Sequence, residues 1–348
     1  AQLGDLAVSG ALTDPKGDRS RRPSQQDDPD VYVRIAEKRG DGIVVRGAKV
    51  HQSGALAADE TLVLPGLGLR PGEEEFAVAF AVPNSAEGLT YIAQYTAFTA
   101  ERMLADDLDD LGNPLYGVRE TCMMVFDDVF IPWDRVFMCG EVDFAGVMVS
   151  RFARMHRMNC GGACKVGFGD LMIGAAQLAA EYSGIARASH VANKVTDMVF
   201  LNETAHACAI AAAEKGSEVP KGSSVWLPDK VFGNVAKLNS AHGFYELMKL
   251  LGDVGGGMVV TMPSECELDN PETSEYVRKY LKGAPDVPVE ARMRLTKFIQ
   301  NWAAGLHGVG TWHGAGSPQA QRMAIYRNAA LDELKDLVVD LAQIEIAE

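Results

Sequence analysis

Hydrophobic and polar positions follow two different periods along the chain. Up to about residue 140, short runs such as 31–35 alternate apolar with polar residues and are separated by turn-forming residues, which is typical of β-strands. From about residue 145, apolar residues recur every three or four positions, which is typical of helices. The pattern predicts an α+β protein, with a β domain over 1–140 and a helical bundle over 141–348.

Short strands are predicted throughout the β domain. Gly40-Asp41-Gly42 tolerates positive φ and predicts a tight hairpin between the first two strands. The even spacing of the runs predicts an antiparallel β-barrel, with a sandwich as the alternative. The acidic stretch 106–110 is interpreted as a solvated loop rather than a metal site. The predicted strands are 31–35, 42–50, 61–65, 76–83 and 122–126.

Glycine and proline divide the second half of the chain into long predicted helices. The connections are short, so neighbouring helices are expected to pack antiparallel in a bundle. The predicted helices are 145–184, 187–216, 226–251, 288–306 and 318–346.

Composition narrows the functional class. The chain has 33 basic and 47 acidic residues and a net charge of −14, which argues against nucleic-acid binding and against an anionic membrane surface as partner. No apolar run approaches the ~20 residues of a membrane span, and no charged-then-apolar leader opens the sequence, so a cytoplasmic protein is expected. The six cysteines are too few and too scattered for a disulfide framework and are expected to be reduced.

The densest cluster of chemically active side chains lies between His156 and Lys165. On a straight α-helix Cys160 lies about 40° and Cys164 about 80° from His156 around the axis, so all three point to one side. His156 and Cys164 are then ~12 Å apart along the axis, too far for one metal ion, although a multi-iron cluster is wider. A local break at Gly161-Gly162 would shorten this span. On spacing alone, a buried histidine with two core cysteines is the favoured interpretation.

Two polar segments of the β domain could bind a cofactor. Thr13-Asp14-Pro15-Lys16-Gly17-Asp18-Arg19 combines a hydroxyl, backbone donors and two cations, which suits a diphosphate or a flavin edge, although a polar surface turn has the same composition. His51-Gln52-Ser53-Gly54-Ala55 follows a strong strand and could face a planar ligand, or could be a plain strand exit.

A glycine-rich segment precedes the last predicted helix. In His313-Gly314-Ala315-Gly316-Ser317-Pro318-Gln319, Ser317 is a typical N-cap and Pro318 a typical first helical residue. Unpaired N–H groups at such a helix start can bind an anion, although a capped helix after a flexible connection explains the segment equally well. Neither a G-x-G-x-x-G after a strand nor a Walker loop occurs, so Rossmann and P-loop nucleotide binding are not supported.

Several of these segments together resemble the 4-hydroxybutyryl-CoA dehydratases (vinylacetyl-CoA Δ-isomerases), a group within the 4-hydroxyphenylacetate 3-hydroxylase family, whose architecture is like that of acyl-CoA dehydrogenases. The resemblance covers essentially the whole chain, and the His–Cys cluster ending in Cys164-Lys165 is what points to the dehydratases. The segment 125–133 is shared across the superfamily and is unspecific. The segments that carry the resemblance are 13–19, 51–55, Glu120 ahead of 125–133, 156–165 and 313–319.

The resemblance implies FAD and a [4Fe-4S] cluster between a middle β domain and the bundle of a homotetramer. It also implies an N-terminal helical domain that carries two cysteine ligands of the cluster, and this sequence is expected to lack that domain. The other two ligands would be His156 and Cys164. Cys160 competes with Cys164, because the stretch from His156 is one residue longer than the family pattern. The FAD-binding residues implied are Leu12, Thr13, Asp14, Lys16, Gly17, Asp18, Gln52, Ser53 and Lys165.

The activity implied is dehydration of 4-hydroxybutyryl-CoA to crotonyl-CoA, with vinylacetyl-CoA isomerase activity, by a flavin radical mechanism in which the cluster is a Lewis acid. His156 would be the base, Glu120 would move the C2 proton, and Lys165 would lie beside the flavin. Without the resemblance, Glu120 is interpreted as a salt-bridged strand residue and Lys165 as a cation on the helix surface. An acidic residue is expected just ahead of His313, where this chain has Thr311 and Trp312.

Two other hypotheses remain open at this point. The first is an FAD-dependent aromatic monooxygenase of the 4-hydroxyphenylacetate 3-monooxygenase type, without a cluster. The second is a non-catalytic fragment that assembles with a longer chain and exposes an apolar face.

Overall fold

The computed structural model describes residues 4–94, 121–303, 314 and 316–344 of the 348-residue chain. The chain divides into two compact units. The first comprises Ala1–Phe152 with Gly305–Gly310, and the second comprises Ala153–Ala304 with Thr311–Glu348.

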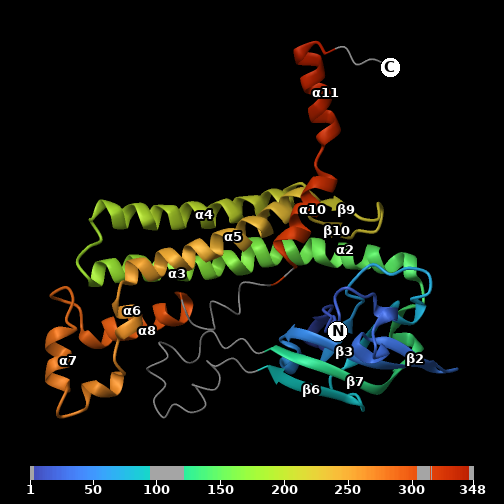
Figure 1. The fold of residues 1–348 in the computed structure, drawn as a ribbon, viewed down its shortest axis with the longest axis horizontal. Coiled ribbons are helices and arrows are strands. Elements are labelled where there is room, and N and C mark those ends of the chain that lie inside the picture. Colours follow the sequence, from blue (N-terminus) through green and yellow to red (C-terminus); the bar gives the residue numbers. More distant parts are fainter. Residues whose placement is uncertain (1–3, 95–120, 304–313, 315, 345–348) are drawn as a thin grey trace. The chain divides into compact units, whose positions relative to one another are not determined.

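The first unit contains two four-stranded sheets. One has the strand order β1-β4-β5-β8, and its β1–β4 pair is parallel; the other has the order β2-β3-β7-β6 and is antiparallel throughout. In the second sheet, β3, β7 and β6 lie side by side (Figure 1). The strands are β1 (Val8–Ala11), β2 (Arg34–Lys38), β3 (Gly42–Ser53), β4 (Glu60–Val63), β5 (Val78–Pro83), β6 (Leu89–Gln94), β7 (Thr121–Pro132) and β8 (Val136–Cys139).

Alternating burial explains why these sheets pack on one another. Along the first half of β7, buried Cys122, Met124 and Phe126 alternate with half-buried neighbours, as a strand with one face in a core requires. Their side chains join Ile43 and Phe80 in one apolar cluster drawn from both sheets. The outer face of the β1-β4-β5-β8 sheet is covered by the start of helix α2 (Val142–Asn159), through Ala145 and its neighbours.

The predicted antiparallel barrel is therefore wrong in two respects. The strands form two separate sheets rather than a closed barrel, and β1 pairs with β4 in parallel. Residues 31–35 are also not one strand: Pro29–Val31 is a 3-10 turn capped by the Asp28 side chain, and β2 begins at Arg34. The Gly40-Asp41-Gly42 hairpin is confirmed, since β2 and β3 pair antiparallel on either side of it.

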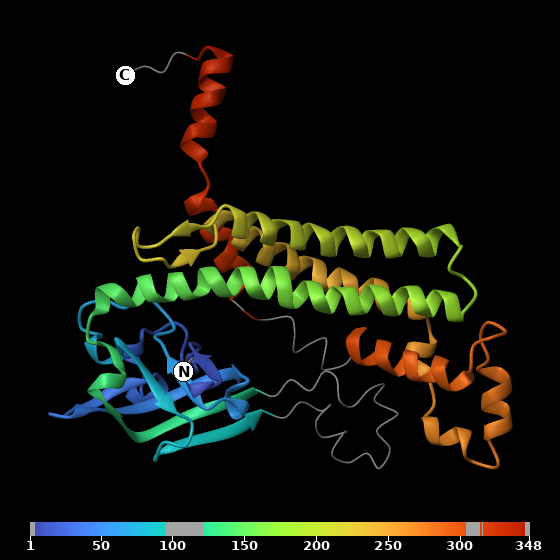
Figure 2. The ribbon, with the colours of Figure 1, turned by 180° about the vertical axis from the view of Figure 1, so that it is seen from behind.

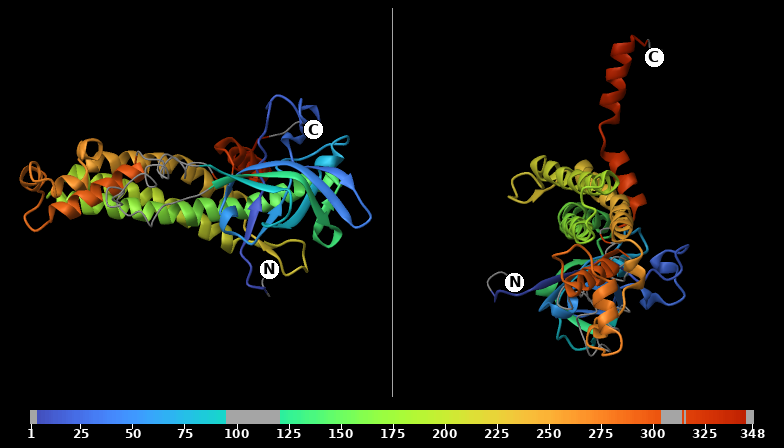
Figure 3. Two further views of the ribbon diagram at one scale, coloured as in Figure 1. Left: turned by 90° about the horizontal axis from the view of Figure 1, so that it is seen from below. Right: turned by 90° about the vertical axis from the view of Figure 1, so that its left-hand side faces the viewer.

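The second unit is built on long helices. Figure 2 shows α4 and α5 running alongside α3, and the right-hand view of Figure 3 looks roughly along these helices. The helices after α2 are α3 (Lys165–Tyr182), α4 (Ser189–Glu214), α5 (Lys230–Gly255), α6 (Met258–Thr261), α7 (Ser274–Tyr280), α8 (Val289–Ala303), α10 (Pro318–Asn328) and α11 (Leu331–Ala342), with a short hairpin of β9 (Ser217–Glu218) and β10 (Trp226–Leu227).

An apolar core holds α3, α4, α5 and α8 together. Its fully buried members include Met172, Met198, Leu251 and Ile299, one from each of these helices. Deleting a side chain of this kind costs about 2–5 kcal/mol, so this cluster accounts for much of the unit's stability. Among the described helices, none has both the length and the apolar character needed to cross a membrane.

The helix predictions hold with three differences. The predicted helix 145–184 is interrupted by a π-helical turn, η8 (Cys160–Cys164). The predicted helix 318–346 is two helices, because Ala329 and Ala330 leave the helical conformation. The short helices α6 and α7 were not predicted. All six cysteines are free, as expected.

Candidate active site

Two of the predicted cofactor-binding segments lie together in the first unit. The backbone N–H of Val50, on β3, donates to the carbonyl oxygen of Thr13 at 2.9 Å, and the buried Gln52 amide donates to the same oxygen at 3.4 Å. The segment that follows β1 is therefore held beside the end of β3. Sequence spacing alone could not establish this, because the two segments are 39 residues apart.

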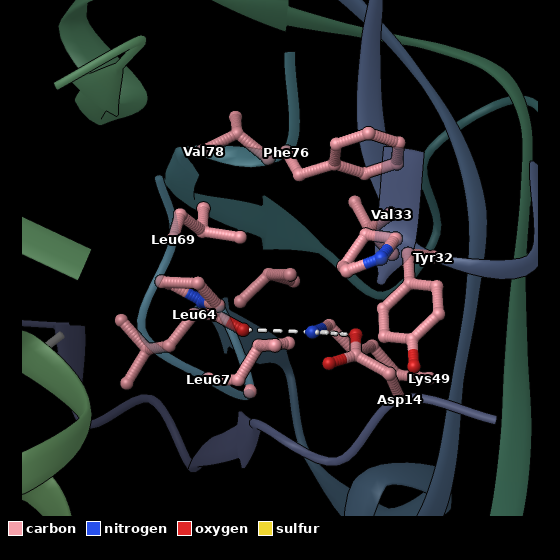
Figure 4. Close-up of a pocket in the computed structure, with 13 residues that line it drawn as sticks. Asp14, Tyr32, Val33, Lys49, Leu64, Leu67, Leu69, Phe76 and Val78 are labelled. Atoms are coloured by element: carbon pink, nitrogen blue, oxygen red, sulfur yellow. Dashed lines mark hydrogen bonds and ion pairs between the residues drawn. The ribbon is translucent and has the colours of Figure 1, made fainter. Parts of the chain in front are cut away.

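A buried ion pair fixes the base of this arrangement (Figure 4). The Lys49 ammonium lies 2.5 Å from an Asp14 carboxylate oxygen and also donates to the carbonyl oxygens of Leu12 at 3.1 Å and Leu64 at 2.8 Å. The two side chains are 2% and 4% exposed. Burial lowers the pKa of Lys49, and the Asp14 carboxylate opposes that effect.

The ion pair leaves little room for a ligand at Asp14. The cavity around it has a volume of about 10 Å³, roughly that of one water molecule. In this structure Asp14 therefore binds Lys49 and anchors the loop. Its role in cofactor binding stays a prediction.

The loop beyond Asp14 has an unusual backbone. Lys16 and Gly17 have φ of +79° and +51°, and such a conformation in a non-glycine residue is often found at functional sites. The Gln26 side chain fixes the loop, because its amide oxygen accepts from the Asp18 N–H and its nitrogen donates to the Asp18 carbonyl, both at 2.9 Å. Lys16, Gly17 and Asp18 are exposed and available to a ligand.

The end of β3 offers a second set of exposed groups. His51 has φ of +61° and Gly54 has φ of +79°, so the chain turns sharply on both sides of Ser53. His51 and Ser53 are exposed, whereas Gln52 is buried and acts on the backbone of Val50 and Thr13.

In the second unit, Cys160 and Cys164 are the first and last residues of the π-helical turn η8, and His156 lies on the preceding helix α2. The wider i→i+5 hydrogen bonding of η8 accommodates one extra residue within a continuous helix, and such turns are frequent at functional sites. His156 is exposed, Cys160 is buried, and Cys164 is half-buried. The favoured interpretation from spacing, a buried histidine with two core cysteines, is thus wrong for His156.

The extra residue changes which side chains share a face. With one residue absorbed by the π turn, His156 and Cys164 are related as positions seven apart on an α-helix, about 20° around the axis instead of about 80°. Cys160 lies on the buried side, where a Cβ on Gly314 would come within 2.9 Å of its sulfur.

Lys165 is buried rather than on the helix surface. Its side chain is 3% exposed, and its ammonium lies 5.3 Å from the ring centroid of Phe244 and 5.9 Å from that of Phe168. Both distances are within the range of a cation–π interaction. The interpretation of Lys165 as a helix-surface cation is wrong.

Lys237 on α5 was missed by sequence reasoning. It is 1% exposed, and burial lowers its pKa, while the thiols of Cys160 and Cys164 act in the opposite direction. Its backbone packs on the π turn at Gly161. Position 237 shares the buried face of α5 with Gly233, Ser240 and Phe244, and the spacing of these residues was the signal that could have identified a buried cation.

The glycine-rich segment before α10 also lies at this turn. Besides the contact of Gly314 with Cys160, a Cβ on Gly316 would lie 3.8 Å from the Arg157 guanidinium. Ser317 caps α10 by accepting from the Ala320 N–H, as predicted. Two of the sequence segments, 156–165 and 314–317, are therefore brought together.

Some predicted site residues lie outside the described residues, namely Glu120, His313, Thr311 and Trp312, and so does the stretch 106–110. Within the described ranges, no group of three or more histidine, cysteine or acidic side chains is placed to hold a metal ion.

Family models match both parts of the chain. Residues 1–138 match the N-terminal model of 4-hydroxyphenylacetate 3-hydroxylase, and residues 145–343 match its C-terminal model. The chain belongs to the 4-hydroxyphenylacetate 3-hydroxylase family.

Individual relatives place it more narrowly within that family. It is 44% identical to 4-hydroxybutyryl-CoA dehydratase/vinylacetyl-CoA-Δ-isomerase of Clostridium aminobutyricum, over 99% of this chain and 72% of that protein. It superposes with a TM-score of 0.94 on the archaeal 4-hydroxybutyryl-CoA dehydratase of N. maritimus, at 40% identity, over 99% of this chain and 69% of that one.

Similarity to the oxygenases is lower. The identity is 32% to the oxygenase component of 4-hydroxyphenylacetate 3-monooxygenase of Thermus thermophilus, over 88% of this chain and 61% of that protein. An oxygenase component of 4-hydroxyphenylacetate 3-monooxygenase solved in complex with FAD superposes with a TM-score of 0.87 at 26% identity, over 97% of this chain and 70% of that one.

Proposed function

We propose that the protein dehydrates 4-hydroxybutyryl-CoA to crotonyl-CoA and isomerises vinylacetyl-CoA, using FAD and a [4Fe-4S] cluster. The observation that carries this proposal is the 44% identity to a 4-hydroxybutyryl-CoA dehydratase over 99% of the chain. The aromatic monooxygenase is the weaker candidate, because identity to those relatives is lower.

The residues present fit a flavin. Lys16–Asp18 and Ser53 are exposed in the β domain, where Gln26 holds Asp18 and Gln52 holds Thr13 by hydrogen bonds. In this proposal the β domain (1–140) faces the flavin, and the bundle (141–348) supplies Lys165 and the iron ligands. FAD supplies one-electron chemistry that activates an otherwise inert C–H bond.

The donor set of the π turn also fits half of an iron–sulfur cluster. Cysteine thiolates, and histidines in some centres, ligate such clusters. The last turn of α2 carries one imidazole and the π turn carries one thiol on the same side of the helix. We assign His156 and Cys164 as ligands, with buried Cys160 behind them. Two further cysteines would come from an N-terminal helical domain. The cluster supplies a Lewis acid for the departing hydroxyl group.

Two side chains would move protons, and a third would act on the flavin. A neutral imidazole suits both iron ligation and proton transfer near pH 7, so His156 would leave the iron and then accept the C3 proton. Glu120 would carry the C2 proton. Lys165, held by Phe244 and Phe168, would present a fixed positive charge to the flavin.

We also propose a homotetramer in the cytoplasm. Support for assembly comes from α11, whose Leu334, Leu337, Val338 and Leu341 are more than half exposed. An apolar helix face of this kind usually packs against another chain. The free state of all six cysteines is consistent with a reducing compartment.

One experiment distinguishes the dehydratase from the monooxygenase activity. The chain, extended at its N-terminus by a helical domain of the dehydratase type and prepared without oxygen, is given 4-hydroxybutyryl-CoA or vinylacetyl-CoA, and crotonyl-CoA is followed by chromatography. A parallel sample receives 4-hydroxyphenylacetate with oxygen and reduced FAD. We expect crotonyl-CoA from both thioesters and no hydroxylated phenol; the reverse result would overturn the proposal.

A further inference from the structure

A cationic pocket opens on the first unit, next to the loop that carries Lys16 and Gly17. Its volume is about 240 Å³, and it is lined by Lys16, Arg19, Arg21 and Arg22 together with Ser20 and Tyr32. The lining contains four cations and no acidic residue, in a chain whose net charge is −14. Positive charge gathered at one place on an otherwise acidic protein favours an anionic ligand.

The four cations are not equivalent. Arg22 donates to the buried Glu73 carboxylate and to the Gly68 carbonyl, and Arg21 pairs with Asp27 at 2.5 Å and Asp18 at 3.4 Å. Within the described part of the chain, Lys16 and Arg19 form no ion pair. Two fixed arginines therefore shape the pocket, and two exposed cations remain available to bind an anion.

The pocket is preorganised. The Tyr32 hydroxyl donates to the Lys16 carbonyl at 3.0 Å, and the Gln26 side chain holds Asp18 by two hydrogen bonds. A Cβ on Gly17 would overlap the Gln26 amide oxygen, so a larger residue would push the Gln26 side chain away, and the φ of +51° also favours glycine. A loop fixed before binding loses less conformational entropy when the ligand arrives.

Resting on the function proposed above, we propose that this pocket binds the 3′-phosphate of the CoA nucleotide. FAD and CoA both carry phosphates beside adenosine, but only CoA carries a phosphate monoester. A monoester has a charge of about −1.5 to −2 near neutral pH, which matches the two available cations. The pocket is smaller than typical whole-ligand sites of roughly 300–1,000 Å³, so it holds the charged end of a longer molecule.

The test compares Arg19→Gln, which removes an available cation that is not assigned to the flavin, with Arg39→Gln, which removes an exposed arginine elsewhere on the same unit. Calorimetric titrations measure the Kd of crotonyl-CoA and of crotonyl-dephospho-CoA, and absorbance measures FAD retained after gel filtration. In the unaltered protein and in Arg39→Gln, we expect crotonyl-CoA to bind about tenfold more tightly than its dephospho form, as two charge-assisted contacts to a phosphate would give. In Arg19→Gln the two Kd values should move closer together while FAD is retained.

The following outcomes would overturn the inference. If Arg19→Gln loses FAD and keeps the tenfold preference, the pocket binds the flavin diphosphate. If neither property changes, or if neither thioester binds, it serves no nucleotide. These readouts are binding constants and do not depend on turnover. A protein that prefers crotonyl-CoA but forms no product would therefore refute the proposed reaction without refuting the phosphate site.

Discussion

Gly161 of the π turn lies directly against Lys237 of α5. A Cβ on Gly161 would come within 2.6 Å of the Lys237 Cα, so the two backbones touch where other residues would keep them apart. Ser240, one turn further along α5, donates from its hydroxyl to the Gly161 carbonyl. This contact holds the shape of the turn that carries Cys160 and Cys164.

We therefore expect Gly161→Ala to destabilise the protein by about 1–3 kcal/mol, the usual cost of forcing an added methyl group into a packed interior. Guanidinium denaturation followed by circular dichroism measures the loss. Gly167→Ala on α3 is the matched control, because nothing lies within 4 Å of its added Cβ. It should be neutral or more stable, by up to about 1 kcal/mol, since alanine favours helix more than glycine does. Equal stability of the two variants would contradict the packing described for the turn.

The Asp14–Lys49 pair predicts a strong asymmetry between single and double variants. Asp14→Leu leaves the Lys49 ammonium buried without its partner, and we expect a loss of about 3–5 kcal/mol. Asp14→Leu/Lys49→Met removes both charges and should recover most of it. A double variant as unstable as the single one would show that the charges themselves are not responsible.

Glu73 gives a pH-dependent prediction. Burial disfavours its carboxylate, but hydrogen bonds from the Arg22 side chain and the Arg70 N–H outweigh this effect and lower its pKa. A lowered carboxyl pKa contributes stability above the unfolded-state value, about 4.3, and this contribution is lost as the pH falls through the folded-state value. The difference in unfolding free energy between the unaltered protein and Glu73→Gln should thus be constant above about pH 6 and shrink below about pH 4. A difference that grows on acidification would contradict this assignment.

The sequence predicted most helices and strands because their period is local. It could not predict the closure of the sheets, since alternation in β7 shows which residues face inward and not which strands pair at the edges. The break between α10 and α11 was not predicted either, because Ala329 and Ala330 are neither glycine nor proline.

The candidate site was only partly predictable for a related reason. Asp14 looks like a surface loop residue until Lys49, 35 positions away, is placed beside it. The π turn depends on contacts with α5, which a helical period does not contain. Gly161-Gly162 did indicate a local irregularity, and the structure places one there.

The ligand assignment on the π turn is tested most directly by iron analysis. The chain, extended at its N-terminus by a helical domain of the dehydratase type, is purified without oxygen, and iron, acid-labile sulfide and FAD are measured. We expect about four irons per FAD in the unaltered protein and in Cys160→Ser, and severe loss of iron with FAD retained in Cys164→Ser and His156→Ala. Full iron content in Cys164→Ser would contradict the assignment, and FAD without iron in every variant would refute the cluster altogether.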